Sequence, residues 1–381
     1  MSGSQYTKCV QAICMTMKQL AALEFPAYGS LYFANAPFDS ALKKEFSKGF
    51  CIGPHCGTAY WDLDGQGIVR PSAPAWGPWS DLAAYASGLI DNGYSRLPPP
   101  STEISRPSYF GALEEHRNLL RSGREVIQSL VLQSQIREAA APTLLHADLN
   151  ARNIYVANDD PTKVTCLIDW QSSSIEPAFI YANELPDFAT PASHPSPGET
   201  EDETCDRSAS MTEQDKKLEK VALYCYQAYD ICTKAFIPRM RVARALDQVL
   251  VRPFQYCHTS WRDSAPAFRQ ELLDLADQWE GLGLTGCCPY KPSSEELELH
   301  RKEYTSFKHV QELKLTLIQL LNTDSDGWVP IDRWEEVRRA HKEVFDLALE
   351  TARNGDDDTE DDPLSEEDVR ELWPFDDQTF N

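Results

Sequence analysis

Apolar residues recur along most of the chain every three or four positions, the spacing that gathers side chains on one face of an α-helix. In the opening segment, for example, Ile13, Met17 and Leu20 share one face. This spacing predicts helices over the segments 8–23, 80–93, 109–138, 213–235, 239–249, 265–281, 294–321 and 331–353. The leucine and tryptophan positions of the last two segments should face a core.

Short apolar runs bounded by turn residues predict a few strands between these helices. Strands are expected over 30–34 and 143–145, and a β-hairpin over 153–157 and 163–168. The stretch 35–78 is dense in glycine, proline and tryptophan and should contain turns and short hairpins. The expected fold class is therefore α+β, mostly helical with short β-hairpins.

Composition divides the chain into several parts. Residues 189–213 collect proline, serine, threonine and acidic residues, which predicts a disordered insertion. This insertion separates a first part, 1–188, from a helical part, 214–353. The remainder, 354–381, is an acidic tail, since residues 351–381 hold 12 acidic residues and only two arginines. Such a run predicts a solvated, mobile end.

The charge balance is strongly acidic, with 36 Lys and Arg against 59 Asp and Glu and a formal charge of −23. A polyanion repels phosphate backbones and anionic lipid surfaces, so nucleic-acid binding and general membrane-surface binding are disfavoured. The sequence has no long apolar run, and no membrane span is expected. The N-terminal residues lack the features of signal and transit peptides, which predicts a cytoplasmic protein.

The eleven cysteines are odd in number and irregularly spaced, which indicates reduced thiols rather than a disulfide framework. Cys51, His55 and Cys56 invite comparison with a zinc site. A matched second pair of ligands is missing, however, so we interpret these cysteines as free thiols on a loop.

The segment around the predicted hairpin carries the clearest chemistry. Phosphoryl transfer needs a carboxylate beside the acceptor hydroxyl, and an amide oxygen and a second carboxylate that hold Mg²⁺ against the nucleotide phosphates. Asp148 precedes the hairpin, Asn153 begins it and Asp169 follows it. Closing the hairpin should therefore bring Asn153 and Asp169 together. His146 should brace the loop by a hydrogen bond to the backbone near Asp169.

The run His146-x-Asp148-x-x-x-x-Asn153, followed by Ile168-Asp169-Trp170, resembles the aminoglycoside phosphotransferase and choline kinase group of protein-kinase-like enzymes. It is especially similar to a fungal branch of that group that includes a mitochondrial protein. Further similarity to this branch lies in scattered blocks over roughly residues 15 to 350: 25–33, 52–54, 77–79 and 184–188.

The resemblance implies a role for each of these residues. Asp148 would be the catalytic base or hydroxyl-orienting group, Asn153 and Asp169 would be the ligands of Mg²⁺ at the nucleotide, and His146 would be a structural brace. ATP and Mg²⁺ are the implied cofactors, and a small-molecule hydroxyl of unknown identity is the implied acceptor. The resemblance also suggests a mitochondrial location beside the cytoplasmic one that the N-terminus predicts.

Kinases also use a glycine-rich turn and a strand lysine, carried by a small N-terminal lobe, to hold the nucleotide phosphates. The lysines that precede His146 are Lys8, Lys18, Lys43, Lys44 and Lys48, and none lies in a strand of the expected kind. We therefore expect a kinase-like C-terminal lobe without its N-terminal lobe. Residues 1–188 would supply its catalytic loop and metal-binding hairpin, and residues 214–353 its helical remainder.

Three hypotheses of function stay open at this point. The first is an ATP-dependent small-molecule kinase domain. The second is a non-catalytic pseudokinase or scaffold that binds a protein partner, in a mitochondrial maintenance role suggested by the resemblance. The third has His146, Asp148 and Asp169 hold a catalytic metal for hydrolysis.

Overall fold

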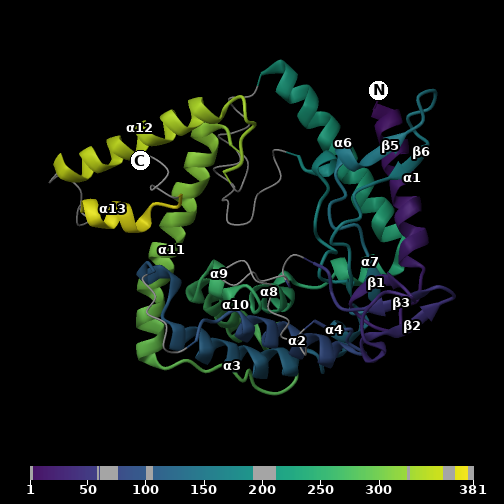
Figure 1. Ribbon diagram of the computed structural model, residues 1–381, viewed down its shortest axis with the longest axis horizontal. Helices are drawn as coiled ribbons and strands as arrows, with labels where there is room; N and C mark the ends of the chain where they lie inside the picture. Colours follow the sequence, from purple (N-terminus) through teal and green to yellow (C-terminus); the bar gives the residue numbers. More distant parts are fainter. Residues whose placement is uncertain are drawn as a thin grey trace.

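The computed structural model describes residues 3–57, 60, 76–99, 106–191, 212–323, 327–354 and 365–375. It is a mixed α+β structure, mostly helical with small antiparallel sheets, which confirms the expected class (Figure 1). Most of the predicted insertion and much of the acidic tail lie outside the described residues. Within the described part of the chain, no helix has the length and apolar character that crossing a bilayer requires.

Most of the helices lie in segments that the apolar spacing predicts, but those over 248–256, 260–263 and 366–372 lie mostly or wholly outside them. The helices are α1 (Gly3–Ala21), α2 (Leu82–Ser95), α3 (Leu113–Leu130), α4 (Ser134–Glu138), α6 (Glu213–Phe236), α7 (Pro238–Arg244), α8 (Gln248–Tyr256), α9 (Ser260–Asp263), α10 (Ala265–Gln278), α11 (Ser294–Leu321), α12 (Trp334–Asn354) and α13 (Glu366–Leu372). Side-chain caps fix several of their starts. Asp81 accepts the Ala84 N–H at 2.8 Å, and Ser293 and Glu296 form a reciprocal capping box at the start of α11.

Two segments predicted as single helices are each broken into two. The segment 109–138 forms α3 and α4, and the turn between them lets the Gln133 side chain accept hydrogen bonds from the backbone N–H and hydroxyl of Thr285, both at 3.2 Å. The segment 239–249 ends as α7, and α8 begins where Asp247 accepts the Val249 N–H at 3.0 Å. Contacts with distant segments and local capping outweigh the continuous apolar spacing in these places.

The strands form three small antiparallel sheets. They are β1 (Ser30–Phe33), β2 (Lys44–Ser47) and β3 (Phe50–Gly53) in the order β1-β3-β2, β4 (Pro142–Leu144) with β7 (Ile175–Pro177), and β5 (Ile154–Val156) with β6 (Val164–Leu167). The hairpin β5–β6 is the one predicted, with Ile154 opposite Leu167. A bridge between Gly29 and Ile175 connects β7 to the segment that enters β1.

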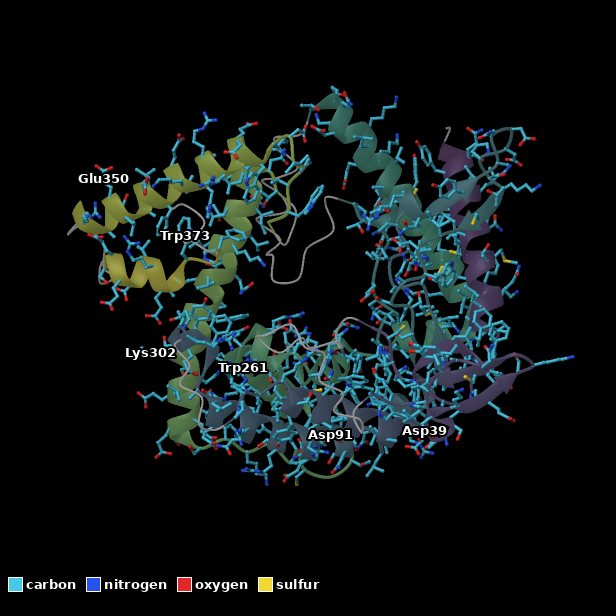
Figure 2. The ribbon with its side chains drawn as sticks, in the orientation of Figure 1. Asp39, Asp91, Trp261, Lys302, Glu350 and Trp373 are labelled. Atoms are coloured by element: carbon cyan, nitrogen blue, oxygen red, sulfur yellow. The ribbon has the colours of Figure 1, made fainter. Side chains whose placement is uncertain are left out.

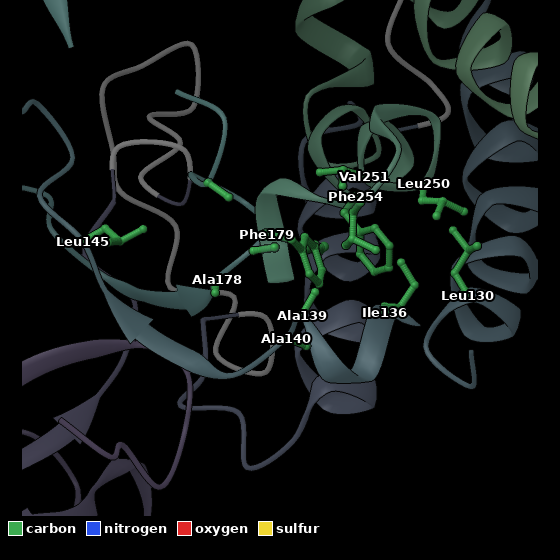
Figure 3. Packing of buried hydrophobic residues seen from close by; sticks show 14 of the residues in the cluster. Leu130, Ile136, Ala139, Ala140, Leu145, Ala178, Phe179, Leu250, Val251 and Phe254 are labelled. Atoms are coloured by element: carbon green, nitrogen blue, oxygen red, sulfur yellow. The ribbon is translucent and has the colours of Figure 1, made fainter. Parts of the chain in front are cut away.

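One hydrophobic core joins most helices to the sheets. Phe179, which follows β7, and Phe254 of α8 are fully buried with ring centroids 5.2 Å apart. Figure 3 shows the two rings next to each other, with Ile136 of α4 beside Phe254 and Leu130 of α3 beyond it. The same core includes Leu145 and Leu149, so it packs directly against the loop that carries Asp148.

A second, smaller cluster lies between the end of α11 and the helices α12 and α13. Trp373 is buried there against Phe345, with ring centroids 4.8 Å apart (Figure 2). The expectation of a solvated, mobile tail is thus wrong for residues 365–375. Val369 of α13 and Trp373, the residue that follows this helix, both pack in this cluster.

Candidate active site

His146 holds the loop between β4 and β5 in place. Its Nε2 donates a hydrogen bond to the Ile168 carbonyl oxygen at 2.8 Å, and its Nδ1 accepts the Asp148 N–H at 3.1 Å. The Trp170 ring packs edge-on against the imidazole, with centroids 4.5 Å apart. Both ring nitrogens are therefore used by the backbone. This is the bracing that the sequence predicts, and it disfavours a metal held by His146.

Asp148 and Asn153 form the centre of the loop. Asn153, at the end of a short 3₁₀ turn (Ala151–Asn153), is buried and donates from its amide nitrogen to the Asp148 carbonyl oxygen at 2.8 Å and to the carboxylate Oδ2 at 2.9 Å. Arg152 also donates to Oδ2, at 2.6 Å, and the Asn150 amide donates to Oδ1. The Asp148 carboxylate remains 34 % exposed, so it is oriented by its neighbours and still accessible.

Asp169 lies two residues beyond the end of β6 and is exposed. Its φ is 64°, a left-handed conformation that aspartate tolerates better than most residues and that ends the strand with a sharp turn. The Ile168 N–H donates to the Asn153 carbonyl oxygen at 3.0 Å. The closed hairpin therefore brings the backbones of Asn153 and Asp169 side by side, as the spacing predicts.

Side-chain oxygen atoms that could bind a magnesium ion are present where Asn153 and Asp169 meet. Within the described residues, no hydrogen bond is formed by the Asn153 amide oxygen or by the Asp169 carboxylate. Mg²⁺ prefers oxygen ligands and usually takes one or two carboxylates together with waters and substrate phosphates. The donor set fits such an ion. In the same part of the chain, no group of three or more His, Cys, Asp or Glu is arranged to hold a metal.

Asp187 holds the loop that carries Asp148 in place, and it was not singled out as a functional residue from the sequence. Its carboxylate Oδ1 accepts the Ala151 N–H at 2.7 Å, and its own N–H donates to the Asn150 side chain at 3.0 Å. These reciprocal bonds fasten the loop to the 3₁₀ turn Asp187–Ala189. The block 184–188, which the sequence marks only as a point of resemblance, is the signal that could have found this residue.

A cavity of about 320 Å³ opens beside Asp148. Leu145 and Tyr229 line its apolar side, and Glu184 contributes a second carboxylate to its wall. Desolvation by the surrounding protein raises the pKa of Glu184 to about 7, although the residue is exposed to solvent. The cavity is thus large enough for a small molecule and carries one carboxylate that titrates near neutral pH.

Cys51 and Cys56 are free thiols, as the sequence predicts, but Cys51 lies in a strand and not on a loop. Cys51 is buried within β3, and His55 is buried with its Nε2 paired to the Glu176 carboxylate of β7. The His55 Nδ1 accepts the Gly57 N–H at 2.9 Å. Neither ring nitrogen is free for zinc, and the ten cysteines within the described ranges are all free thiols.

Comparisons with known proteins agree with the site geometry. Over residues 87–180, which include His146, Asp148, Asn153 and Asp169, the sequence matches the model of the phosphotransferase enzyme family (APH). No solved structure matches the chain.

Distant relatives occur in fungi. A subtelomeric hrmA-associated cluster protein of Aspergillus fumigatus is 23 % identical over 415 residues, which cover 96 % of this chain and 77 % of that protein. The protein named altered inheritance of mitochondria protein 9, mitochondrial, of Lachancea thermotolerans is 24 % identical over 364 residues, which cover 88 % of this chain and 57 % of that protein. The segment 87–180 is therefore similar to the phosphotransferase enzyme family, the resemblance that the run from His146 to Trp170 predicts.

Proposed function

We propose that this protein is an ATP-dependent, aminoglycoside phosphotransferase-like enzyme that moves a phosphoryl group to a hydroxyl of a small molecule. The observation that carries this proposal is the hairpin-closed arrangement of Asp148, Asn153 and Asp169 inside the family segment. By the same resemblance, the fold around the site is a protein-kinase-like C-terminal lobe.

In this proposal Asp148 positions the acceptor. Its carboxylate faces the cavity of about 320 Å³ and is held by Asn153 and Arg152, so a hydroxyl that enters the cavity can donate to it. The hydroxyl oxygen then bonds to the γ-phosphorus of ATP, the bond from that phosphorus to ADP breaks, and Asp148 takes the hydroxyl proton. The Asn153 and Asp169 oxygens would hold Mg²⁺, which neutralises charge on the phosphates when it is bound.

A non-catalytic scaffold is the second candidate. Large apolar side chains stand exposed on the loop that precedes α12, with Trp328 65 % and Ile331 89 % exposed. Such residues favour contact with another protein. A mitochondrial location and a maintenance role are proposed from the name of the relative in Lachancea thermotolerans alone.

Calorimetric titration with ATP, with and without Mg²⁺, tests the enzyme proposal. We expect Mg²⁺-dependent binding that weakens at least tenfold in Asp169→Ala. The control Asp159→Ala removes an exposed carboxylate from the turn of the same hairpin and should bind as the wild type does. Unchanged binding in Asp169→Ala would refute the assignment, and absence of nucleotide binding in every protein would favour the scaffold.

A further inference from the structure

The three-stranded sheet carries an apolar groove that shares no lining residue with the cavity at Asp148. The groove has a volume of about 570 Å³ and is lined mainly by Leu31, Tyr32, Phe33, Ala36, Pro37 and Phe50. Phe33 is 68 % exposed, and its ring stacks on that of Phe50 with centroids 5.5 Å apart. Figure 1 shows the sheet at the margin of the molecule. Two aromatic rings on one open face are unusual for a surface without a partner.

The groove lies along an unpaired strand edge. Strand β1 pairs with β3 on one side only, and the Ala34 N–H donates to the Gly49 carbonyl oxygen at 2.9 Å. Along an antiparallel strand, the N–H and C=O groups of successive residues point alternately toward the neighbouring strand and away from it. Since those of Ala34 point toward β3, those of Leu31, three residues earlier, point away from it. Within the described residues, only the start of this edge is covered, where Gly29 pairs with Ile175. An extended segment could therefore pair with Leu31 and lie in the groove.

Lysines stand around the groove in an otherwise acidic chain. Lys43 donates to the carbonyl oxygens of Ala34 at 3.1 Å and of Ala36, a lining residue, at 2.6 Å, which keeps its charge at the rim. Lys48 is exposed on the turn that leads into Phe50. Asp39, a nearby acid, already accepts the Ala41 N–H at 2.9 Å. Over residues 39–50, three lysines against Asp39 and Glu45 give a net charge of +1, which favours carboxylates at the groove although the chain as a whole has a formal charge of −23.

We propose that this groove binds an extended acidic peptide of a partner protein. The peptide adds beside β1, places a large apolar side chain against Phe33 and Phe50, and directs its carboxylates to Lys43 and Lys48. The concave shape and the free strand edge favour a peptide over an anionic membrane, which a convex apolar surface would suit better. The proposal is independent of the enzyme function, since none of these residues contacts the catalytic loop.

Selection of random twelve-residue peptides on the immobilised full chain provides the test. We expect recovered peptides to combine an aromatic or large aliphatic residue with neighbouring Asp or Glu. A labelled representative should bind at least tenfold more weakly to Phe33→Ala and to Lys48→Glu. Matched controls are Leu132→Ala, an exposed apolar residue elsewhere, and Lys163→Glu, an exposed lysine on the β5–β6 hairpin, and both should bind as the wild type does.

Other results would overturn the proposal. Recovery of no peptides, of basic peptides, or of peptides that bind equally to Phe33→Ala would exclude this groove as an acidic-peptide site. Vesicles of phosphatidylcholine with phosphatidylserine serve as the competing probe. Sedimentation with these vesicles that is lost in Phe33→Ala and Lys48→Glu would assign the surface to an anionic membrane instead. Far-ultraviolet circular dichroism of each variant excludes unfolding, which is not expected because both changed side chains are exposed.

Discussion

The buried pair of His55 and Glu176 provides a quantitative test of how the structure is held together. The pair connects the segment after β3 to β7, and both side chains are almost fully buried. His55 also packs against Tyr60, with ring centroids 4.1 Å apart, and Ser174 donates to the Glu176 carboxylate at 2.9 Å. Replacing His55 with Phe preserves an aromatic ring at this position and removes the counterpart of the carboxylate.

The expected magnitude follows from the burial. Burial by itself would raise the pKa of Glu176, but its interaction with His55, together with hydrogen bonds from Tyr85 and Ser174, outweighs this effect, and the pKa is held below its ordinary value. Removing one partner of a buried pair leaves an uncompensated charge and costs about 3–5 kcal/mol. We therefore expect His55→Phe to lower the free energy of unfolding by about that amount at pH 7. The variant Glu176→Gln retains a hydrogen-bond acceptor and should cost about 1–3 kcal/mol.

Urea denaturation followed by tryptophan fluorescence measures these differences. The double variant His55→Phe/Glu176→Gln has no buried carboxylate, so its cost should fall below the sum of the single costs by at least about 1 kcal/mol. A cost below about 1 kcal/mol for His55→Phe, or strictly additive costs, would refute the reasoning. Because the pKa of Glu176 is lowered in the fold, its contribution is present above its ordinary pKa of 4.5 and is lost as the pH falls further.

Three further predictions concern other parts of the molecule. A Cβ on Gly88 of α2 would lie 2.2 Å from the Trp79 indole nitrogen, so Gly88→Ala should lower the free energy of unfolding by about 1–3 kcal/mol. An unchanged midpoint of urea denaturation would contradict this packing. Glu184 has a pKa of about 7 in the folded state against an ordinary value of 4.5, so the folded state binds its proton more tightly than the unfolded state does. The wild type should therefore lose stability relative to Glu184→Gln as the pH rises from 5 to 8. An equal change of the free energy of unfolding with pH in both proteins would contradict this. Trp373→Ala should destabilise the cluster of α11, α12 and α13 by about 3–5 kcal/mol and speed amide hydrogen exchange in α12 and α13, while Trp328→Ala, at an exposed position, should leave exchange unchanged. Equal exchange in both variants would show that α13 is not held by Trp373.

The candidate site could be predicted from the sequence because its parts are local. Asp148, Asn153 and Asp169 lie within 22 residues of one another, and one hairpin with clear turn residues joins them. The brace by His146 follows from the same short segment. Most helices could also be predicted from the sequence, since their apolar residues repeat at helical spacing over two or more turns.

Other features depend on contacts between distant segments. Strand β7 has three residues, ends at Pro177 and shows no alternation, so only its pairing with β4 and with Gly29 makes it a strand. The pair of His55 and Glu176 joins positions 121 residues apart. The groove at Phe33 likewise requires that the loop after β1 folds back onto the sheet. No local spacing signals such contacts.

The proposed metal site can be tested most directly by electron paramagnetic resonance of Mn²⁺, used in place of Mg²⁺. The proposal predicts that Mn²⁺ binds only when ATP is present, that Asp169→Ala and Asn153→Ala each lose this binding, and that Asp148→Asn retains it because Asp148 is not a ligand. Binding of Mn²⁺ without nucleotide would favour a hydrolytic metal site. Binding that survives in Asp169→Ala would contradict the assignment of this hairpin as the metal-binding element of a phosphotransferase.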